Sequence, residues 1–235
     1  MIGVVVPAHN EQACLRDCLR ALRRAALDPA LAGEAVSIVV VLDNCSDRSQ
    51  AIVARHAARR SPPACRISWL TVAACNVGVA RAAGADYLLA EGARWLAFTD
   101  ADTRVSPAWL VMQLRQNADV VCGSIAIDDW SPHGGQGLAL HDHFLRTYDD
   151  SDGHRHIHGA NLGVSAAAYR RAGGFAPLAC HEDVALVAAL ERTGASVAWS
   201  AAPRVATSAR TDARARGGFG DTLLAVVAAQ QAALP

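Results

Sequence analysis

Two carboxylates separated by one residue, Asp100 and Asp102, directly follow the apolar run 95–98. On extended backbone, residues two apart project to the same side, so both side chains can address one divalent ion, or one ion and one ribose. Mg²⁺ or Mn²⁺ is the expected ion, because hard cations prefer oxygen ligands and can bridge a diphosphate. An isolated Asp-x-Asp is also typical of a turn after a strand, so its meaning depends on the surrounding sequence.

A second acidic pair, Glu182 and Asp183, opens a segment with helical character. The positive end of a helix dipole favours ionised carboxylates at this position. First-turn acidic residues are also common without any catalytic role. The two pairs together therefore indicate chemistry only if the fold brings them to one place.

Short apolar runs alternate with longer helix-like segments over the first hundred residues. The expected strands are 3–6, 36–42, 67–71 and 95–98, and the expected helices are 13–26, 49–58 and 77–91. Near-continuous Val, Ile and Leu runs predict strands buried on both faces of a mostly parallel sheet built from βαβ units, an α/β fold flanked by helices. Ligands bind beyond the carboxyl ends of strands in such sheets, so chemistry is expected after each run.

The sheet is expected to continue beyond Asp102. Ser106 and Pro107 predict the N-cap and first residue of a helix reaching 117, and 120–127 predicts a strand. Composition predicts a loop or lid over 128–137. Further expected elements are helices over 165–172 and 182–193, each closed by glycine, a mobile loop over 207–220, and an amphipathic helix over 221–235.

Composition removes several classes of protein. The 235 residues predict a single domain, and zero net charge gives no global field for nucleic acid, which is not an expected partner. All 22 basic residues are arginine, which excludes a lysine Schiff base and a P-loop lysine. Seven cysteines without a CxxC pair predict buried thiols in a reducing compartment. With neither a secretory leader nor a membrane span evident, a cytoplasmic protein is expected, either free or peripheral to a membrane.

Seven short motifs occur in order along the chain. They are Pro7-Ala8-His9-Asn10-Glu11, Leu42-Asp43-Asn44-Cys45-Ser46-Asp47, Asn76 to Gly84, Phe98 to Asp102, and the later set Gly159-Ala160-Asn161, Gly173-Gly174-Phe175 and Glu182-Asp183. In this order the chain resembles the inverting family 2 glycosyltransferases, over about residues 2–195. The resemblance implies a GT-A fold and a metal-dependent hexosyltransferase that transfers sugar from a UDP- or GDP-sugar to a hydroxyl acceptor, which the sequence does not identify.

The resemblance also implies residue roles. Asp102 would be the principal ligand of Mg²⁺ or Mn²⁺, Asp100 would reach the metal or the ribose, and Asp183 would be the general base that takes the acceptor proton. Donor contacts would come from Pro7, Ala8, Glu11, Asp43, Gly78, Arg81, Asp100, Asn161, Glu182, Arg214 and Arg216. Residues 1–102 would form the nucleotide-sugar-binding half, 103–220 the acceptor-binding half and 221–235 a C-terminal helix, whose apolar stripe would suit a homodimer.

The chain departs from the family pattern near its C-terminus. It has no Gln-x-x-Arg-Trp motif and no histidine after His181. Arginines 210, 214 and 216 are a substitute able to hold a diphosphate, because guanidinium forks pair with phosphate oxygens, although a solvated basic loop explains them as well.

Three alternating histidines, His154, His156 and His158, would share one face of a strand, a pattern that also fits a metal site. Because they precede Gly159-Ala160-Asn161, contacts to the acceptor or a plain surface position are favoured over zinc. Two other functions stay open. A sugar-phosphate nucleotidyltransferase would place a glycine-rich basic loop after its first strand, where this chain has Ala8 to Glu11. A catalytically inactive nucleotide-sugar-binding module would not require Asp100, Asp102 and Asp183 together.

Overall fold

The computed structural model describes residues 1–59 and 64–212. Its centre is an eight-stranded sheet in the order β3-β2-β1-β4-β7-β6-β8-β5. The strands are β1 (Ile2–Ala8), β2 (Val36–Asp43), β3 (Cys65–Val72), β4 (Trp95–Phe98), β5 (Arg104–Val105), β6 (Val120–Ile127), β7 (Leu162–Ser165) and β8 (Val197–Thr207). The helices are α1 (Leu15–Ala26), α2 (Ser49–Ala57), α3 (Val77–Ala90), α4 (Trp109–Arg115), α5 (Gly137–Thr147), α6 (Ala166–Ala172) and α7 (Glu182–Arg192), with 3₁₀ turns η1 (Pro29–Leu31) and η2 (Ser131–Gln136).

The sheet is mostly parallel, as the sequence predicts. Strand β1 pairs in parallel with β2 and β4, β2 with β3, and β6 with β8, whereas β7 runs antiparallel to both β4 and β6, and β5 to β8. The register sets Ala8 beside Leu42 and Val5 beside Phe98. The residues that follow β1, β2 and β4 therefore emerge from the same edge of the sheet.

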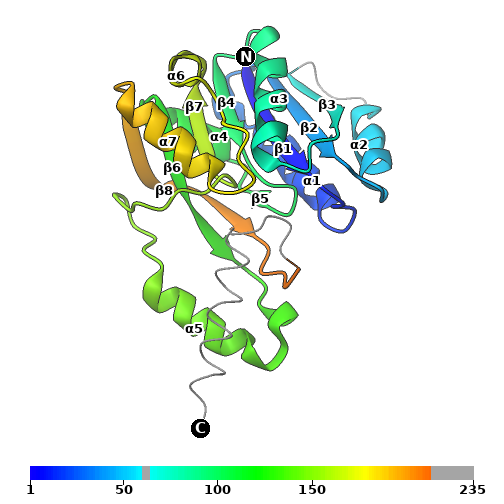
Figure 1. The fold of residues 1–235 in the computed structure, drawn as a ribbon, viewed down its shortest axis with the longest axis vertical. Helices are drawn as coiled ribbons and strands as arrows, with labels where there is room; N and C mark the ends of the chain where they lie inside the picture. The colour runs from blue at the N-terminus through cyan, green and yellow to red at the C-terminus, as the bar shows by residue number, and fades with distance from the viewer. Residues whose placement is uncertain (60–63, 213–235) are drawn as a thin grey trace.

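Side chains of β1 and β2 alternate between two apolar cores. Val4 and Ile38 belong to a core shared with α1, α2 and α4, while Val5 and Val39 belong to one shared with α3, α6 and α7. This period of two is what a strand covered on both faces requires. Figure 1 shows the helices on either side of the sheet, with α5 extending away from it. The strand ends are thereby held between two rigid helical layers.

Several boundaries agree closely with the sequence prediction. The strands predicted over 95–98 and 120–127 have those bounds, and the helix predicted over 165–172 is α6, capped by Ser165, whose side chain accepts from the Ala168 N–H. Gly173 ends α6 at φ 86°, a left-handed conformation that glycine adopts without strain.

Other predictions need correction. Ser106 does not cap α4, because the chain makes a turn in which the Ser106 carbonyl accepts from the Trp109 N–H, and Ala108 directly precedes the helix. The loop predicted over 128–137 contains η2 and leads into α5, which the sequence pattern did not predict. Thr207 is the last residue of β8, so the loop predicted from 207 begins one residue later. The predicted C-terminal helix over 221–235 and the homodimer stripe lie outside the described residues.

In the part of the chain that the structure describes, no helix combines the length and the apolar character needed to cross a membrane.

Candidate functional site

The loops after β1 and β2 are shaped by asparagines in the left-handed region. Asn10 has φ 55° and Asn44 φ 49°, a conformation that asparagine tolerates better than most residues because its short amide can hydrogen-bond locally. The Asn10 carboxamide oxygen accepts from the backbone N–H groups of Ser46 at 2.8 Å and Asp47 at 3.2 Å. The two loops are therefore fastened to each other at the carboxyl edge of the sheet.

Asp43, predicted to contact the base or ribose, is turned toward the protein backbone. Its Oδ1 accepts from the N–H groups of Ala74 at 2.8 Å and Cys75 at 2.9 Å, and its Oδ2 from that of Asn76 at 2.8 Å. A carboxylate has about four acceptor sites, and these bonds use most of them. Asp43 is buried and holds the loop that leads into α3. These bonds position the loop, and a contact from Asp43 to the base or ribose stays a prediction.

Glu11 and Asp102 share one arginine from the far end of the chain. Arg210 donates to both carboxylate oxygens of Glu11, at 2.9 and 2.7 Å, and its Nη2 lies 2.8 Å from Asp102 Oδ2. Two-pronged pairing of this kind fixes both position and orientation. Burial opposes the charge of Arg210, but its hydrogen bonds to Glu11 and the charge of Asp102 raise its pKa. The sequence singled out Arg210 for a diphosphate, and its two carboxylate partners are a finding of the structure.

Asp100 and Glu182 share a second arginine. Arg81, on α3, donates to Asp100 Oδ1 at 2.6 Å and also to Glu182 Oε1. The side chains of Arg81 and Glu182 are 4% and 5% exposed, whereas that of Asp100 is 35% exposed. Arg81 was predicted to contact the donor. In the structure it joins two acidic motifs that are far apart in sequence and leaves Asp100 the most exposed of the three side chains, and its contact with the donor stays a prediction.

Two glycines of the family motifs make this arrangement possible. A Cβ at Gly159 would lie 2.3 to 2.4 Å from the guanidinium atoms of Arg81, and a Cβ at Gly78 would lie 2.5 Å from the carbonyl oxygen of Ala176. Such distances are far inside van der Waals contact. Gly159 therefore accommodates Arg81, and Gly78 lets the segment before α7 approach α3. The donor contact predicted for Gly78 stays a prediction, and the structure shows the close approach of the Ala176 backbone to this glycine.

Four carboxylates and two guanidinium groups thus form one cluster at the carboxyl edge of the sheet. Burial raises the pKa of Asp102 to about 6, the charge of Arg210 lowers it in part, and the charges of Asp100 and Glu11 raise it further. Buried carboxylates without compensation are costly, so the two arginines are needed for the cluster to form.

The cluster fits a divalent ion held jointly with a ligand. Among the described residues, no three His, Cys, Asp or Glu side chains form a metal-binding group. Mg²⁺ and Mn²⁺ are, however, commonly held by one or two carboxylates together with substrate phosphates and water. Asp102 attracts a cationic group already, since Arg210 lies against its Oδ2. Asp100 and Asp102 therefore fit such an ion, provided that Arg210 moves from Asp102.

Asp183 lies in the first turn of α7, beside the arginine-linked Glu182. Its Oδ2 accepts from the Gly159 N–H at 2.7 Å, and its Oδ1 from the Val184 N–H at 2.8 Å. Both bonds come from backbone, so the carboxylate is held in one orientation by rigid parts of the fold. His181, at φ 58°, sets the turn that brings the helix start to this place.

The three histidines do not form a strand. Their rings stack in sequence, with centroids 5.5 Å apart between His154 and His156 and 5.9 Å apart between His156 and His158, and Tyr148 stacks on His156 at 4.2 Å. The Tyr148 hydroxyl and His158 Nε2 are 3.0 Å apart. Burial, followed by the charges of His156 and His154, lowers the pKa of His158 to about 4. The His158 ring at the end of this aromatic stack is therefore uncharged at neutral pH.

The remaining predicted donor residues have different surroundings. Pro7 and Ala8 end β1, and the Ala8 carbonyl accepts from Cys45 Sγ. Asn161 is fully buried, its amide donating to the carbonyls of Ser124 and Pro203 and its oxygen accepting from Trp109 Nε1. Asn161 therefore ties β6, β8 and α4 together inside the core. Arg214 and Arg216 lie outside the described residues.

Sequence reasoning missed Tyr148 and the part that Arg210 plays. Tyr148 ends a helix that was not predicted, so no pattern placed it beside the histidines. Arg210 meets Glu11 across 199 positions of sequence, a distance that no local periodicity encodes.

The comparisons with known proteins now identify the fold. A family model described as glycosyl transferase family 2 matches residues 3–172. The chain belongs to glycosyl transferase family 2. The match covers the sheet edge and the Asp100–Asp102 pair but ends before Glu182 and Arg210. No curated protein matches the chain.

Solved structures of low sequence identity share the fold. TarS 1–349 of S. aureus is 14% identical with a TM-score of 0.64, covering 88% of this chain and 60% of its own. A mannosyltransferase, PcManGT from Pyrobaculum calidifontis, crystallised with GDP-Man and Mn²⁺, is 15% identical with a TM-score of 0.64, covering 91% and 58%.

A third structure, glucosyl-3-phosphoglycerate synthase of Mycobacterium tuberculosis in complex with Mg²⁺ and UDP, is 15% identical with a TM-score of 0.56, covering 100% of this chain and 80% of its own. These likenesses confirm the GT-A type α/β fold. The chain spans about 60% of the length of TarS 1–349 and of PcManGT.

Proposed function

We propose that this protein transfers a sugar from a UDP- or GDP-sugar to a hydroxyl group of an acceptor, with inversion at the anomeric carbon. The observation that carries the proposal is the cluster of Glu11, Asp100, Asp102 and Glu182 at the carboxyl edge of the sheet, compensated by two arginines. Family membership supports glycosyl transfer, and structures of the same fold are complexes with UDP or with GDP-Man.

The donor would lie over the loops that follow β1, β2 and β4. Asp43 and the Asn10 amide hold these loops in place, so the donor meets a preformed surface. Mg²⁺ or Mn²⁺ at Asp100 and Asp102 would neutralise the diphosphate and stabilise the leaving nucleotide. Arg210, once released from Asp102, is placed to pair with phosphate oxygens.

The acceptor would approach from the side of Asp183. Its carboxylate, held by the Gly159 and Val184 N–H groups, would take the proton as the hydroxyl attacks the anomeric carbon. Direct attack by the acceptor inverts the configuration. The stack of Tyr148, His156 and His158 ends at the residue before Gly159, so it would border an acceptor that approaches Asp183. We therefore assign acceptor contacts to this stack.

The first experiment is a thermal-shift screen of UDP- and GDP-sugars with and without Mn²⁺, because a ligand of the native state raises its stability with occupancy. A nucleotide-sugar that raises Tm only with Mn²⁺ would support the assigned donor site. Nucleotide release from that donor would then separate an enzyme from an inactive binding module. Absence of stabilisation by any nucleotide-sugar would contradict the proposal.

A further inference from the structure

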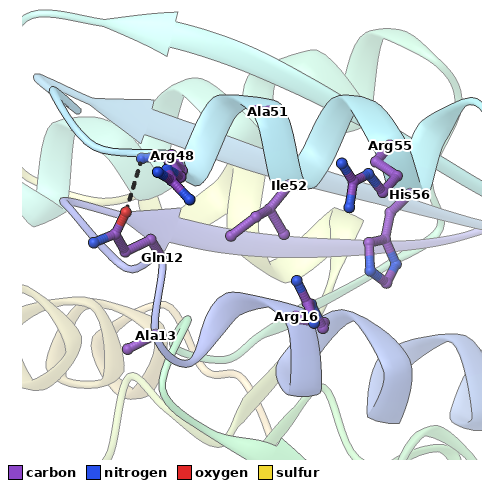
Figure 2. A pocket seen from close by; sticks show the side chains of 8 residues that line it. All are labelled: Gln12, Ala13, Arg16, Arg48, Ala51, Ile52, Arg55 and His56. Atoms are coloured by element: carbon purple, nitrogen blue, oxygen red, sulfur yellow. Dashed lines mark hydrogen bonds between the residues drawn. The ribbon is translucent and has the colours of Figure 1, made fainter.

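A cavity of about 640 Å³ lies between α1 and α2, and no residue of the carboxylate cluster lines it. Figure 2 shows Ile52 and His56 extending from α2 toward α1, and Arg16 extending from α1 toward α2. Gln12, Arg48 and Arg55 also line it, and none of the lining residues is acidic. Its volume is in the range that holds a small molecule.

The arginines that line this cleft lack acidic partners. Outside the cleft, some arginines such as Arg66, Arg94 and Arg104 pair with a carboxylate, and others do not, so what distinguishes the cleft arginines is that three of them line one concave space. Within the described residues, the side chains of Arg16, Arg48 and Arg55 have no such pair. Three positive charges around one concave space favour the binding of an anion.

His56 forms the buried end of the cleft. Its side chain is 5% exposed, and its Nδ1 has no hydrogen-bond partner among the described residues. A buried polar atom without a partner is uncommon and costs free energy unless a ligand or water satisfies it. Burial lowers the pKa of His56, as do the positive charges of Arg59, Arg20, Arg23 and Arg16. The positive charge around this ring is therefore dense.

We propose that the cleft between α1 and α2 is a second binding site, for a small phosphate-bearing molecule. Guanidinium forks match the geometry of phosphate oxygens, and three of them surround one concave space beside the Gln12 amide. The concave shape favours a discrete mono- or diphosphate group over a flat anionic surface. This inference does not rest on the proposed function, because it uses none of the carboxylate-cluster residues.

The test is calorimetric titration of the full chain with inorganic pyrophosphate at low ionic strength in EDTA, which prevents metal-assisted binding at the carboxylate cluster. The double variant Arg16→Gln/Arg55→Gln should weaken the affinity at least about tenfold, the equivalent of about 1.4 kcal/mol. The double control Arg94→Gln/Arg104→Gln, which removes an equal charge from two exposed arginines outside the cleft, should leave affinity within about twofold. NMR of the His56 ring should show a shift on titration in the wild type but not in the cleft variant.

Arg210→Gln separates the two sites. If the cleft binds pyrophosphate, this variant retains wild-type affinity in EDTA. Loss of affinity in Arg210→Gln but not in the cleft variant, or no measurable binding by the wild type, overturns the proposal. Vesicles of phosphatidylcholine with and without phosphatidic acid then distinguish the source of the phosphate. Wild-type cosedimentation that requires phosphatidic acid and is lost in the cleft variant assigns a lipid headgroup, whereas pyrophosphate binding alone assigns a free phosphorylated molecule.

Discussion

Replacing Arg81 tests whether the candidate site is held together by a buried ion pair. Arg81→Gln keeps much of the side-chain stem and removes the charge that Glu182 and Asp100 share. Glu182 is almost fully buried, so its carboxylate would be left without a cation. Removing one member of a buried pair costs about 3–5 kcal/mol, and the more exposed Asp100 adds at most about 1 kcal/mol. A domain is stable by only about 5–15 kcal/mol, so the expected loss of about 4 kcal/mol is large.

The assay is urea unfolding followed by circular dichroism, with two companion variants. Arg66→Gln breaks the more exposed pair with Glu91 and should cost less than about 1 kcal/mol. Arg81→Met/Glu182→Leu removes both buried charges and should recover most of the stability lost by Arg81→Gln, because apolar replacements of a whole buried pair are often neutral. If Arg81→Gln is as stable as the Arg66→Gln control, or if the double variant is no better than the single, the reasoning is wrong.

Three further predictions concern the chemistry and its pH range. Asp183→Asn should lower nucleotide release from the screened donor by about 10²–10⁴-fold while donor affinity stays near normal, and a near-normal rate would rule out its role as base. Asp102→Asn should lose Mn²⁺ binding, measured by electron paramagnetic resonance. Arg210→Gln should bind Mn²⁺ about tenfold more tightly without donor, because the guanidinium that competes with the ion for Asp102 is gone. Weaker Mn²⁺ binding by Arg210→Gln would show that Arg210 and the ion do not compete. His158 has a folded-state pKa of about 4, below its usual 6.5, so the unfolded chain binds more protons than the folded one between these values. The free energy of unfolding should therefore fall as pH drops from 6.5 toward 4, by about 3 kcal/mol for this group. The raised pKa of Asp102 makes stability increase as pH falls over part of this range, which opposes the effect of His158. Urea unfolding as a function of pH should therefore be compared between the wild type and His158→Phe. Parallel stability curves for the two proteins would show that His158 does not contribute.

The parallel half of the fold could be predicted because its signals are local. The apolar run 95–98 predicts a strand, and the glycine after α6 predicts the end of a helix, without reference to distant residues. Strands β5, β7 and β8 were not predicted. β5 has two residues, β7 contains a glycine, and β8 contains Pro203, so each depends on pairing with a distant strand more than on its own pattern.

The acidic residues of the site were predicted, but not the direction in which each one faces. A strand-end aspartate such as Asp43 has the same sequence signature whether its oxygens meet a ligand or the N–H groups of a neighbouring loop. The pairing of Arg210 with Glu11 cannot be predicted from the sequence either, because the position of Arg210 depends on where β8 ends in the fold. The sequence therefore indicates where charge gathers, and the fold decides which charges neutralise each other.

The long separation between partners also governs when the site is complete during synthesis. Glu11 leaves the ribosome 199 residues before Arg210, and Arg81 leaves it 101 residues before Glu182. Chains are made from the N-terminus at about 5–20 residues per second, and contacts between distant residues form late. Glu11 and Asp102 are therefore without the charge of Arg210 for many seconds, whereas Asp100 follows its partner Arg81 by only 19 residues. The carboxylate cluster is complete only after β8 has been made, so a ribosome-bound fragment ending before β8 would hold the loops that follow β1, β2 and β4 without the arginine that pairs with Glu11.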